Sequence, residues 1–256
     1  MIIINKIKNK VKHILKIFVA RIYILKLQII YFIKKTSNND ISICISTTKG
    51  YAEKTIPKLI QDLTKNKIPL NKIFVFEGGY NVNKKNDSVN YNHYFVAHNS
   101  FDLTALISIL ELNIEADNWL LLHDTLEFDN TFKYKFYTIN TQKNDCMPLR
   151  KFPSMNIGIY NSNYIKDNKD FILSIKNIDY SENSLQKFKA LGVDNEDYLF
   201  KNTRNKKIIH EKLFVLHKIK EVIYNNNNRI LEFYPQLGLK KYKANFKKQE
   251  IYTIKL

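Results

Sequence analysis

The stretch Asn118-Trp119-Leu120-Leu121-Leu122-His123-Asp124-Thr125 decides how the rest of the chain is interpreted. Four large apolar residues followed at once by a polar trio predict a buried central strand whose C-terminal end carries His123 and Asp124. In open α/β sheets, ligands bind at the carboxyl ends of the strands. A carboxylate there can hold a divalent metal, because the sheet fixes its position while its tip stays wet. The alternative from this stretch alone is a turn that Asp124 caps.

The segments before this stretch alternate between strands and helices. Apolar runs predict strands at 41–46, 73–76 and 94–97, and apolar residues at helical spacing predict helices at 53–66 and 102–112. This βαβ pattern implies parallel strands joined by right-handed crossovers. The strand ends then bring Thr47, Glu77, Asn99 and Asp124 to one edge of the sheet, which predicts a nucleotide crevice there.

Beyond residue 130 the pattern is less regular. Residues 132–137 alternate aromatic side chains with lysines, which predicts an antiparallel edge strand with its lysines pointing outward. A further strand is expected at 156–160 and helices at 168–175 and 183–191. An acidic cluster follows at residues 194–197. The remaining histidines show no metal-ligand spacing and are expected in loops or on the surface: His93, His98, His210 and His217.

The net charge of +17 lies mainly at the two ends of the chain. Residues 1–40 carry nine Lys or Arg against one acid, whereas residues 41–200 carry eighteen against nineteen. Only four of the forty-one basic residues are arginine, although recognition of phosphates and base edges favours the arginine fork. Nucleic acid is therefore an unfavoured partner. A non-catalytic basic protein that binds nucleic acid or a membrane surface is the competing class.

The N-terminal segment is apolar over residues 14–33 but contains Lys16, Arg21, Lys26 and Gln28. Each charge near a bilayer centre costs roughly 2.5–3.5 kcal/mol, so a spanning helix is penalised. Two interpretations remain: a helix on an anionic membrane surface, or a helix packed on the domain or on a partner with solvated lysines. Residues 36–40 look like the linker that closes this appendage.

The two cysteines, Cys44 and Cys146, are far apart in sequence and indicate a reducing compartment. We therefore expect an intracellular protein, either cytoplasmic or peripherally associated with a membrane through residues 1–40. Three segments are expected: a basic apolar helical appendage over 1–40, an α/β domain over 41–235, and a basic C-terminal extension over 236–256.

With strand ends at Thr47, Glu77 and Asp124 and late acids at 194–197, residues 41–200 resemble nucleotide-sugar glycosyltransferases of the GT-A fold, especially small transferases of large DNA viruses and bacteria. The resemblance implies a Rossmann-type mixed sheet flanked by helices. It also implies transfer of a sugar from a nucleoside-diphosphate donor to a hydroxyl of a glycan or protein acceptor. In this family a metal acts as a Lewis acid on the departing diphosphate, and in inverting members a later carboxylate deprotonates the acceptor.

The resemblance also implies roles for particular residues. Thr47, Glu77, Asn99 and His123 would bind the nucleotide sugar, Asp124 and His123 would hold Mn²⁺ or Mg²⁺, and Asp197 or the adjacent Glu196 would be the catalytic base.

This chain departs from the family's pair of acids, since His123 and Thr125 flank Asp124. His123 can replace a carboxylate toward Mn²⁺, Asp124 can act alone, or the site has no metal. Asp197 would equally serve as a helix cap.

Overall fold

The computed structural model describes residues 2–34, 40–151, 153–179, 181–216, 223–225, 229–242, 244–245 and 250–251. The predicted linker over 36–40, apart from Asp40, lies outside the described residues, as do His217 and much of the predicted C-terminal extension. The chain folds as an α/β protein, as the sequence predicts.

A seven-stranded mixed sheet forms the centre of the fold, in the order β3-β4-β2-β1-β5-β8-β7. Its strands are β1 (Ile41–Thr48), β2 (Ile73–Gly78), β3 (Lys84–Lys85), β4 (Asn92–Val96), β5 (Asn118–His123), β7 (Cys146–Pro148) and β8 (Gly158–Asn161). β4, β2, β1 and β5 are parallel, while β3, β8 and β7 run antiparallel to their neighbours. Along the chain, β2 and then β4 are added on one side of β1, and β5 is then added on the other side of β1.

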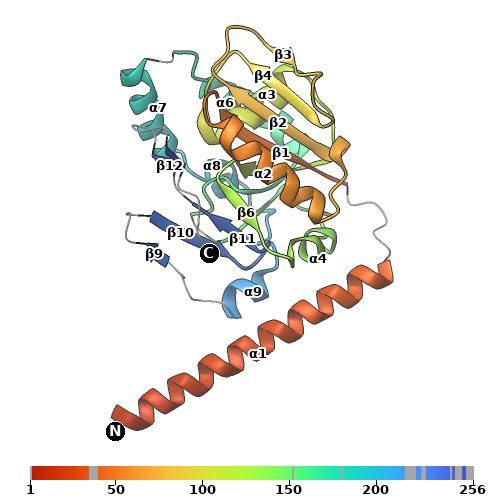
Figure 1. The fold of residues 1–256 in the computed structure, drawn as a ribbon, viewed down its shortest axis with the longest axis vertical. Coiled ribbons are helices and arrows are strands. Elements are labelled where there is room, and N and C mark those ends of the chain that lie inside the picture. The colour runs from red at the N-terminus through yellow and green to blue at the C-terminus, as the bar shows by residue number, and fades with distance from the viewer. Residues whose placement is uncertain are drawn as a thin grey trace.

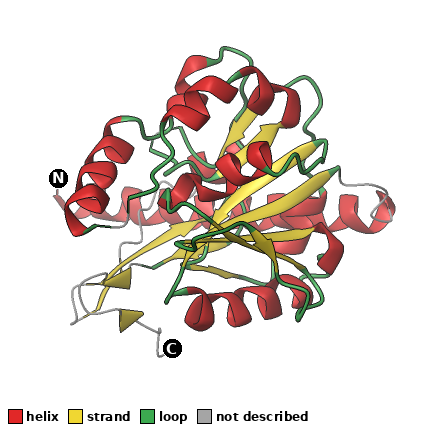
Figure 2. Cartoon of the chain, turned by 90° about the horizontal axis from the view of Figure 1, so that it is seen from above, coloured by secondary structure: helices red, strands yellow, loops and turns green. Residues whose placement is uncertain are grey.

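Helices cover both faces of this sheet (Figure 2). The described helices of the chain are α1 (Ile2–Lys34), α2 (Ala52–Lys65), α3 (Thr104–Glu111), α4 (Phe132–Tyr137), α5 (Ser162–Asp167), α6 (Lys169–Ser174), α7 (Glu182–Asp194), α8 (Tyr198–Asn202) and α9 (Glu211–Leu216), of which α2 and α4 pack on one face of the sheet and α3, α5, α6 and α8 on the other. Short 3₁₀ turns, η1 (Leu70–Lys72) and η2 (Phe101–Leu103), precede β2 and α3. Among the described helices, none combines the length and apolar character that a bilayer crossing needs.

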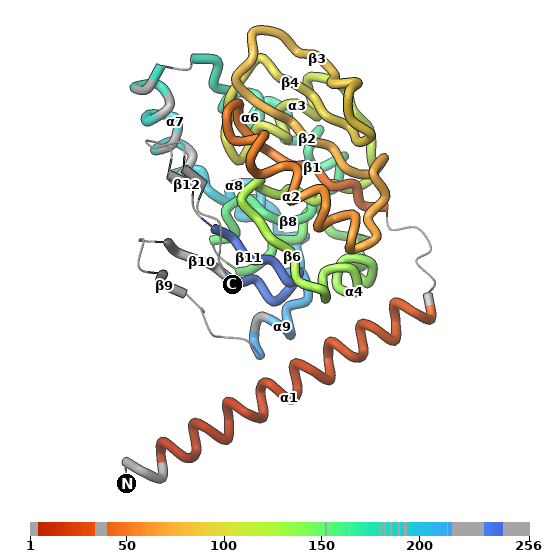
Figure 3. Tube along the Cα trace, in the orientation of Figure 1, coloured from red at the N-terminus to blue at the C-terminus, as the bar shows by residue number. Residues whose placement is uncertain are grey.

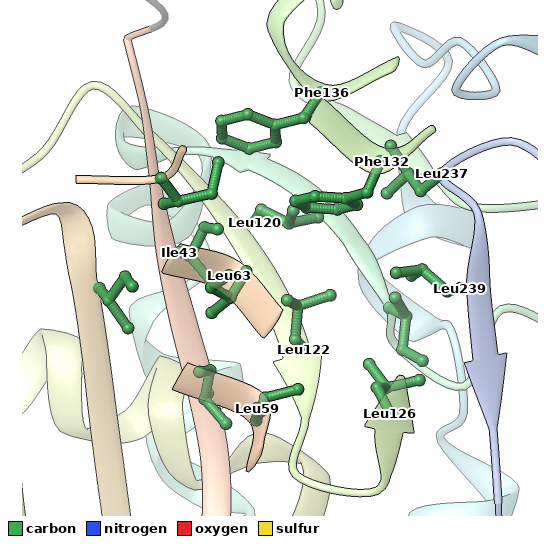
Figure 4. Close-up of a cluster of buried hydrophobic side chains, with 14 of the residues drawn as sticks. Ile43, Leu59, Leu63, Leu120, Leu122, Leu126, Phe132, Phe136, Leu237 and Leu239 are labelled. Carbon is green, nitrogen blue, oxygen red and sulfur yellow. The ribbon is translucent and has the colours of Figure 1, made fainter. Parts of the chain in front are cut away.

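Alternate residues of β5 face opposite sides of the sheet, which explains its unbroken apolar run. Leu120 and Leu122 pack into one core cluster, and Trp119 and Leu121 into the other, all with no measurable exposure. The first cluster contains side chains of α2 and α4 and of the second sheet, as Figure 4 shows around Leu122. The second cluster is closed by α3, α5, α6 and α8.

A second sheet packs beside β5 in the order β6-β11-β10-β9 (Figure 1). It consists of β6 (Leu126–Phe128), β9 (Ile223–Asn225), β10 (Arg229–Tyr234) and β11 (Leu239–Lys241), and a separate pair is formed by β12 (Ala244–Asn245) and β13 (Glu250–Ile251). β11 pairs with both β6 and β10, although the sequence assigned residues from 236 onward to an extension. Leu239 is fully buried in the first core cluster, so this part of the C-terminal stretch belongs to the folded body.

The prediction of an edge strand at 132–137 is wrong, because this segment forms helix α4. Six alternating residues are compatible with either period, and here the buried partners are Phe132 and Phe136, four residues apart on one helical face. Their rings stack with centroids 5.5 Å apart. Lys135, expected to point outward, is only 2% exposed.

Candidate functional site

The site lies between the C-terminal ends of β1 and β5. This is the switch point of the sheet, because β2 and β4 follow on one side of β1 and β5 lies on the other. In open α/β sheets the crevice beyond such a point is the usual ligand site. Thr47 at the end of β1 donates a hydrogen bond of 2.6 Å from Oγ1 to Oδ2 of Asp124, directly after β5. The hydroxyl of Thr55 in α2 shares its proton between the same oxygen, at 3.1 Å, and the Tyr51 carbonyl, at 3.0 Å. Asp124 is thus fixed at the centre of this edge by two hydroxyl groups.

The pKa of the Asp124 carboxyl is raised to about 6. The main cause is its removal from water; the hydrogen bonds from Thr47 and Thr55 act in the opposite direction, Asp102 raises the pKa and Lys241 lowers it. A carboxyl group with this pKa exchanges its proton near neutral pH, a property that is enriched at functional sites.

His123 is the last residue of β5, directly before Asp124, and is 3% exposed. Its Nδ1 is 2.5 Å from Nζ of Lys241, and its Nε2 is 3.4 Å from Oδ1 of Asp102. Burial lowers the pKa of His123 to about 4, with Asp102 opposing this effect and Lys241 adding to it. The imidazole is therefore neutral at pH 7, with Nδ1 accepting from the lysine ammonium and the proton on Nε2.

This arrangement does not fit the divalent cation that the resemblance implies. Of the two ring nitrogens of His123, Nδ1 is engaged by the ammonium of Lys241, whereas Nε2 is buried and has no hydrogen-bond partner among the described residues. Oδ2 of Asp124 accepts from Thr47, and the single hydroxyl proton of Thr55 is shared between this oxygen and the Tyr51 carbonyl. Among the described residues, no three His, Cys, Asp or Glu side chains are grouped so that they could hold an ion together. The positive charge beside Asp124 is instead the Lys241 ammonium.

Asp102 is a member of this site that the sequence interpretation placed only at the start of the helix predicted over 102–112. Its position is fixed from β1, because Oγ of Ser46 donates to the Asp102 carbonyl at 2.9 Å and accepts from the Ala105 amide at 3.0 Å. The Asp102 side chain is 48% exposed and lies beside His123, while its backbone is held by β1.

The two late acids have different environments. Asp197 is 2% exposed, and its carboxylate accepts hydrogen bonds from the amides of Ser154 and Asn156, while its own amide donates to Oδ1 of Asn156 at 3.0 Å. Asp197 adopts a left-handed conformation, with φ of 59°, at the start of α8. These bonds give Asp197 the role of holding the 154–156 loop against α8.

Glu196 lies close enough to Asp102 and Lys241 for their charges to act on its carboxyl group. Burial raises the pKa of Glu196, and the charges of Asp197 and Asp102 raise it further. The charges of Lys241 and Arg150 lower it. Within the described ranges, Oε1 of Glu196 is buried and no hydrogen bond reaches it. A buried, unsatisfied carboxylate oxygen with a raised pKa has the properties of a group that accepts a proton.

Glu77 and Asn99 both lie at the predicted edge, and both side chains are buried, with Asn99 4% exposed. Glu77 is 5% exposed and is fully engaged, accepting from the Tyr80 hydroxyl at 2.7 Å and lying 3.1 Å from Nε2 of His93. Asn99 accepts from Oγ1 of Thr48 at 3.2 Å, joining the ends of β4 and β1. Glu77 therefore braces β2 from within, and Thr48, which is partly exposed, is the member of the Thr48 and Asn99 pair that reaches the surface of the edge.

Two of the histidines expected in loops or on the surface are buried. His93 is 7% exposed beside Glu77, and His98 is completely buried between the hydroxyls of Ser100 and Ser108, at 3.2 and 3.1 Å. Burial lowers the pKa of His98 to about 4. His98 is therefore a neutral core residue.

Comparison of the chain with protein-family models, with curated proteins and with solved structures finds no match.

Proposed function

We propose that this protein is a glycosyltransferase that moves a sugar from a nucleoside-diphosphate donor to a hydroxyl of a glycan or protein acceptor. The observation that supports it best is the placement of Asp124, His123, Lys241 and Glu196 at the β1/β5 switch point, together with the GT-A resemblance of residues 41–200. Two separate tasks are needed there, stabilisation of a departing diphosphate and removal of a proton from the acceptor.

The positive charges of this crevice suit the first task. In the GT-A family a divalent cation supplies that charge, but the donor set of this chain is engaged by Lys241. We assign the diphosphate contact to Lys241, whose ammonium is oriented by the neutral His123 ring, and to Arg150, whose guanidinium lies 5.1 Å from the Tyr234 ring centroid. As the bond from the sugar anomeric carbon to the diphosphate oxygen breaks, these cations offset the charge that develops on the leaving oxygen.

Glu196 suits the second task. The acceptor hydroxyl forms the new bond to the anomeric carbon, and its proton passes to Glu196 when that residue is ionised. Asp124 takes a positioning role between Thr47 and Thr55, and the partly exposed Thr48 offers its hydroxyl to the nucleoside. The buried free cysteines Cys44 and Cys146 favour an intracellular location for this reaction.

Consumption of nucleotide sugars by the full chain tests this proposal. UDP, GDP, CMP and dTDP sugars are supplied with a mixed glycan and peptide acceptor pool, with either Mn²⁺ or EDTA present. Lys241→Met and Glu196→Gln are compared with Lys72→Met, a matched lysine change in a polar hollow that is lined by Asp40, Asp117 and Lys166 at the opposite edge of the sheet.

Turnover of one donor class is expected in EDTA, with losses of roughly 10²-fold or more in the first two variants and none in the third. If turnover requires Mn²⁺, a bound metal and not Lys241 with Arg150 stabilises the departing diphosphate. If no donor is consumed under either condition, the transferase assignment is wrong.

A further inference from the structure

Helix α1 carries a continuous apolar stripe on its solvent side. Ten large apolar side chains, each between 51% and 75% exposed, make up this stripe: Ile7, Val11, Ile14, Leu15, Phe18, Ile22, Leu25, Ile29, Phe32 and Ile33. At about 100° per residue they fall within an arc of roughly 100°. The stripe runs along nearly the whole helix, and a helix with one apolar face needs a partner for that face.

Among the described residues, the folded body covers this stripe only at its C-terminal end, where the ring of Phe32 lies 6.1 Å from that of Tyr134 between centroids. α1 contacts the body through α4 and α9, where Ala20 and Leu27 are buried with Leu213, and Tyr23 and Ile24 pack beside them. These contact residues lie about 130–170° around the helix from the centre of the stripe. Figures 1 and 3 show α1 running past α4 and α9, with its N-terminal end projecting away from the body. Every side chain from 5 to 19 is exposed.

Basic residues border the stripe on both sides. Lys8 and Lys26 lie on one flank and Lys10 and Arg21 on the other, all exposed and about 70–90° from its centre. The helix contains eight Lys or Arg residues and no Asp or Glu. Lysine and arginine stems can extend past an apolar face to place their charges in a layer of anionic groups.

We infer that α1 is an interfacial anchor that lays this stripe into the surface of an anionic lipid bilayer, parallel to the membrane plane. The charge pattern selects the lipid surface over a second copy of the chain, because two α1 helices packed through their stripes would bring their eight flanking charges together with no acidic partner on either helix. Anionic headgroups neutralise the flanking lysines while the acyl boundary takes the apolar side chains.

Sedimentation of the full chain with vesicles tests this inference. Vesicles of phosphatidylcholine alone are compared with vesicles that contain 30% phosphatidylserine, at low and physiological salt. The stripe variant Ile14→Ser with Phe18→Ser is compared with Val82→Ser with Ile178→Ser, which removes two equally exposed apolar side chains from the body. A flank variant, Lys8→Gln with Lys26→Gln, removes charge and leaves the stripe intact.

Binding is expected on the anionic vesicles only, with the matched control unchanged. The partition constant should fall by roughly ten-fold or more in the stripe variant, and by roughly five-fold for each lysine removed in the flank variant. Absence of binding to anionic vesicles, or equal binding to neutral ones, would overturn the inference. So would self-association of the wild type, measured by sedimentation velocity without lipid, that the stripe variant abolishes. These outcomes do not depend on sugar transfer.

Discussion

Replacement of Asp124 by Asn should stabilise the protein increasingly as the pH rises. The pKa of this carboxyl is about 6 in the folded chain against an ordinary value of 3.8. Between these values the folded state holds a proton that the unfolded state has released. The stabilisation from Asp124 is therefore complete below about pH 4 and is lost as the pH rises to about 6.

The magnitude follows from the difference between the two pKa values. At about 1.4 kcal/mol for each pH unit, the free energy of unfolding of the wild type should fall by up to about 3 kcal/mol relative to Asp124→Asn between pH 4 and pH 7. His123, whose folded pKa of about 4 lies below its ordinary 6.5, contributes the opposite slope over this range. Because His123 is present in both proteins, its contribution cancels in the comparison.

Urea unfolding of the two proteins at half-unit pH intervals measures this difference. Thr47→Val is a second test, because it removes the 2.6 Å hydrogen bond that favours the ionised form of Asp124. The pKa of Asp124 should then rise further, so that the loss of stability continues above pH 6. A difference between wild type and Asp124→Asn that stays constant from pH 4.5 to 7.5, or that shrinks as the pH rises, would refute the account of a desolvated Asp124.

Two further predictions concern the scaffold around the site. Gly78→Ala should cost about 1–3 kcal/mol in urea unfolding, because its Cβ would lie 2.5 Å from the His98 carbonyl oxygen. Gly50→Ala, with φ of +85° and nothing within 4 Å of its Cβ, should cost only about 1 kcal/mol, and equal costs would contradict the steric argument. Lys135→Met should leave the stability at pH 7 equal or higher, since burial lowers the pKa of this lysine and makes its charge unfavourable in α4. A loss above about 2 kcal/mol would mean that the charge has a strong partner.

The sheet could be predicted because its signals are local. Each of β1, β2, β4 and β5 is a short apolar run that ends in polar residues, and α2 repeats its apolar residues at helical spacing. Segment 132–137 was misassigned because six residues are too few to separate the two periods. The buried His93 and His98 were missed because their partners, Glu77 and two serines, are brought to them only by the fold.

The site could be predicted only where it coincides with strand ends. Thr47, His123 and Asp124 lie where the strand pattern places them. Lys241 is 118 residues from His123 in sequence and reaches it through the antiparallel pairing of β11 with β6, for which the lysine-rich C-terminal stretch gives no local signal. In the sequence, Asp102 is no different from any other residue at the start of a helix. Its backbone is held in place by the hydroxyl of Ser46, a contact that only the fold creates.

The central claim is that the β1/β5 crevice binds a nucleoside diphosphate through Lys241, and a thermal shift measures this most directly. Wild type, Lys241→Met and Lys72→Met are each heated with UDP, GDP, CDP and dTDP, in EDTA. At 100 times its dissociation constant a ligand stabilises by about 2.7 kcal/mol, which corresponds to a rise of about 5–10 °C for a chain of this length. One nucleotide should produce this rise in wild type and Lys72→Met but not in Lys241→Met. No rise with any nucleotide, or the same rise in all three proteins, would contradict the claim.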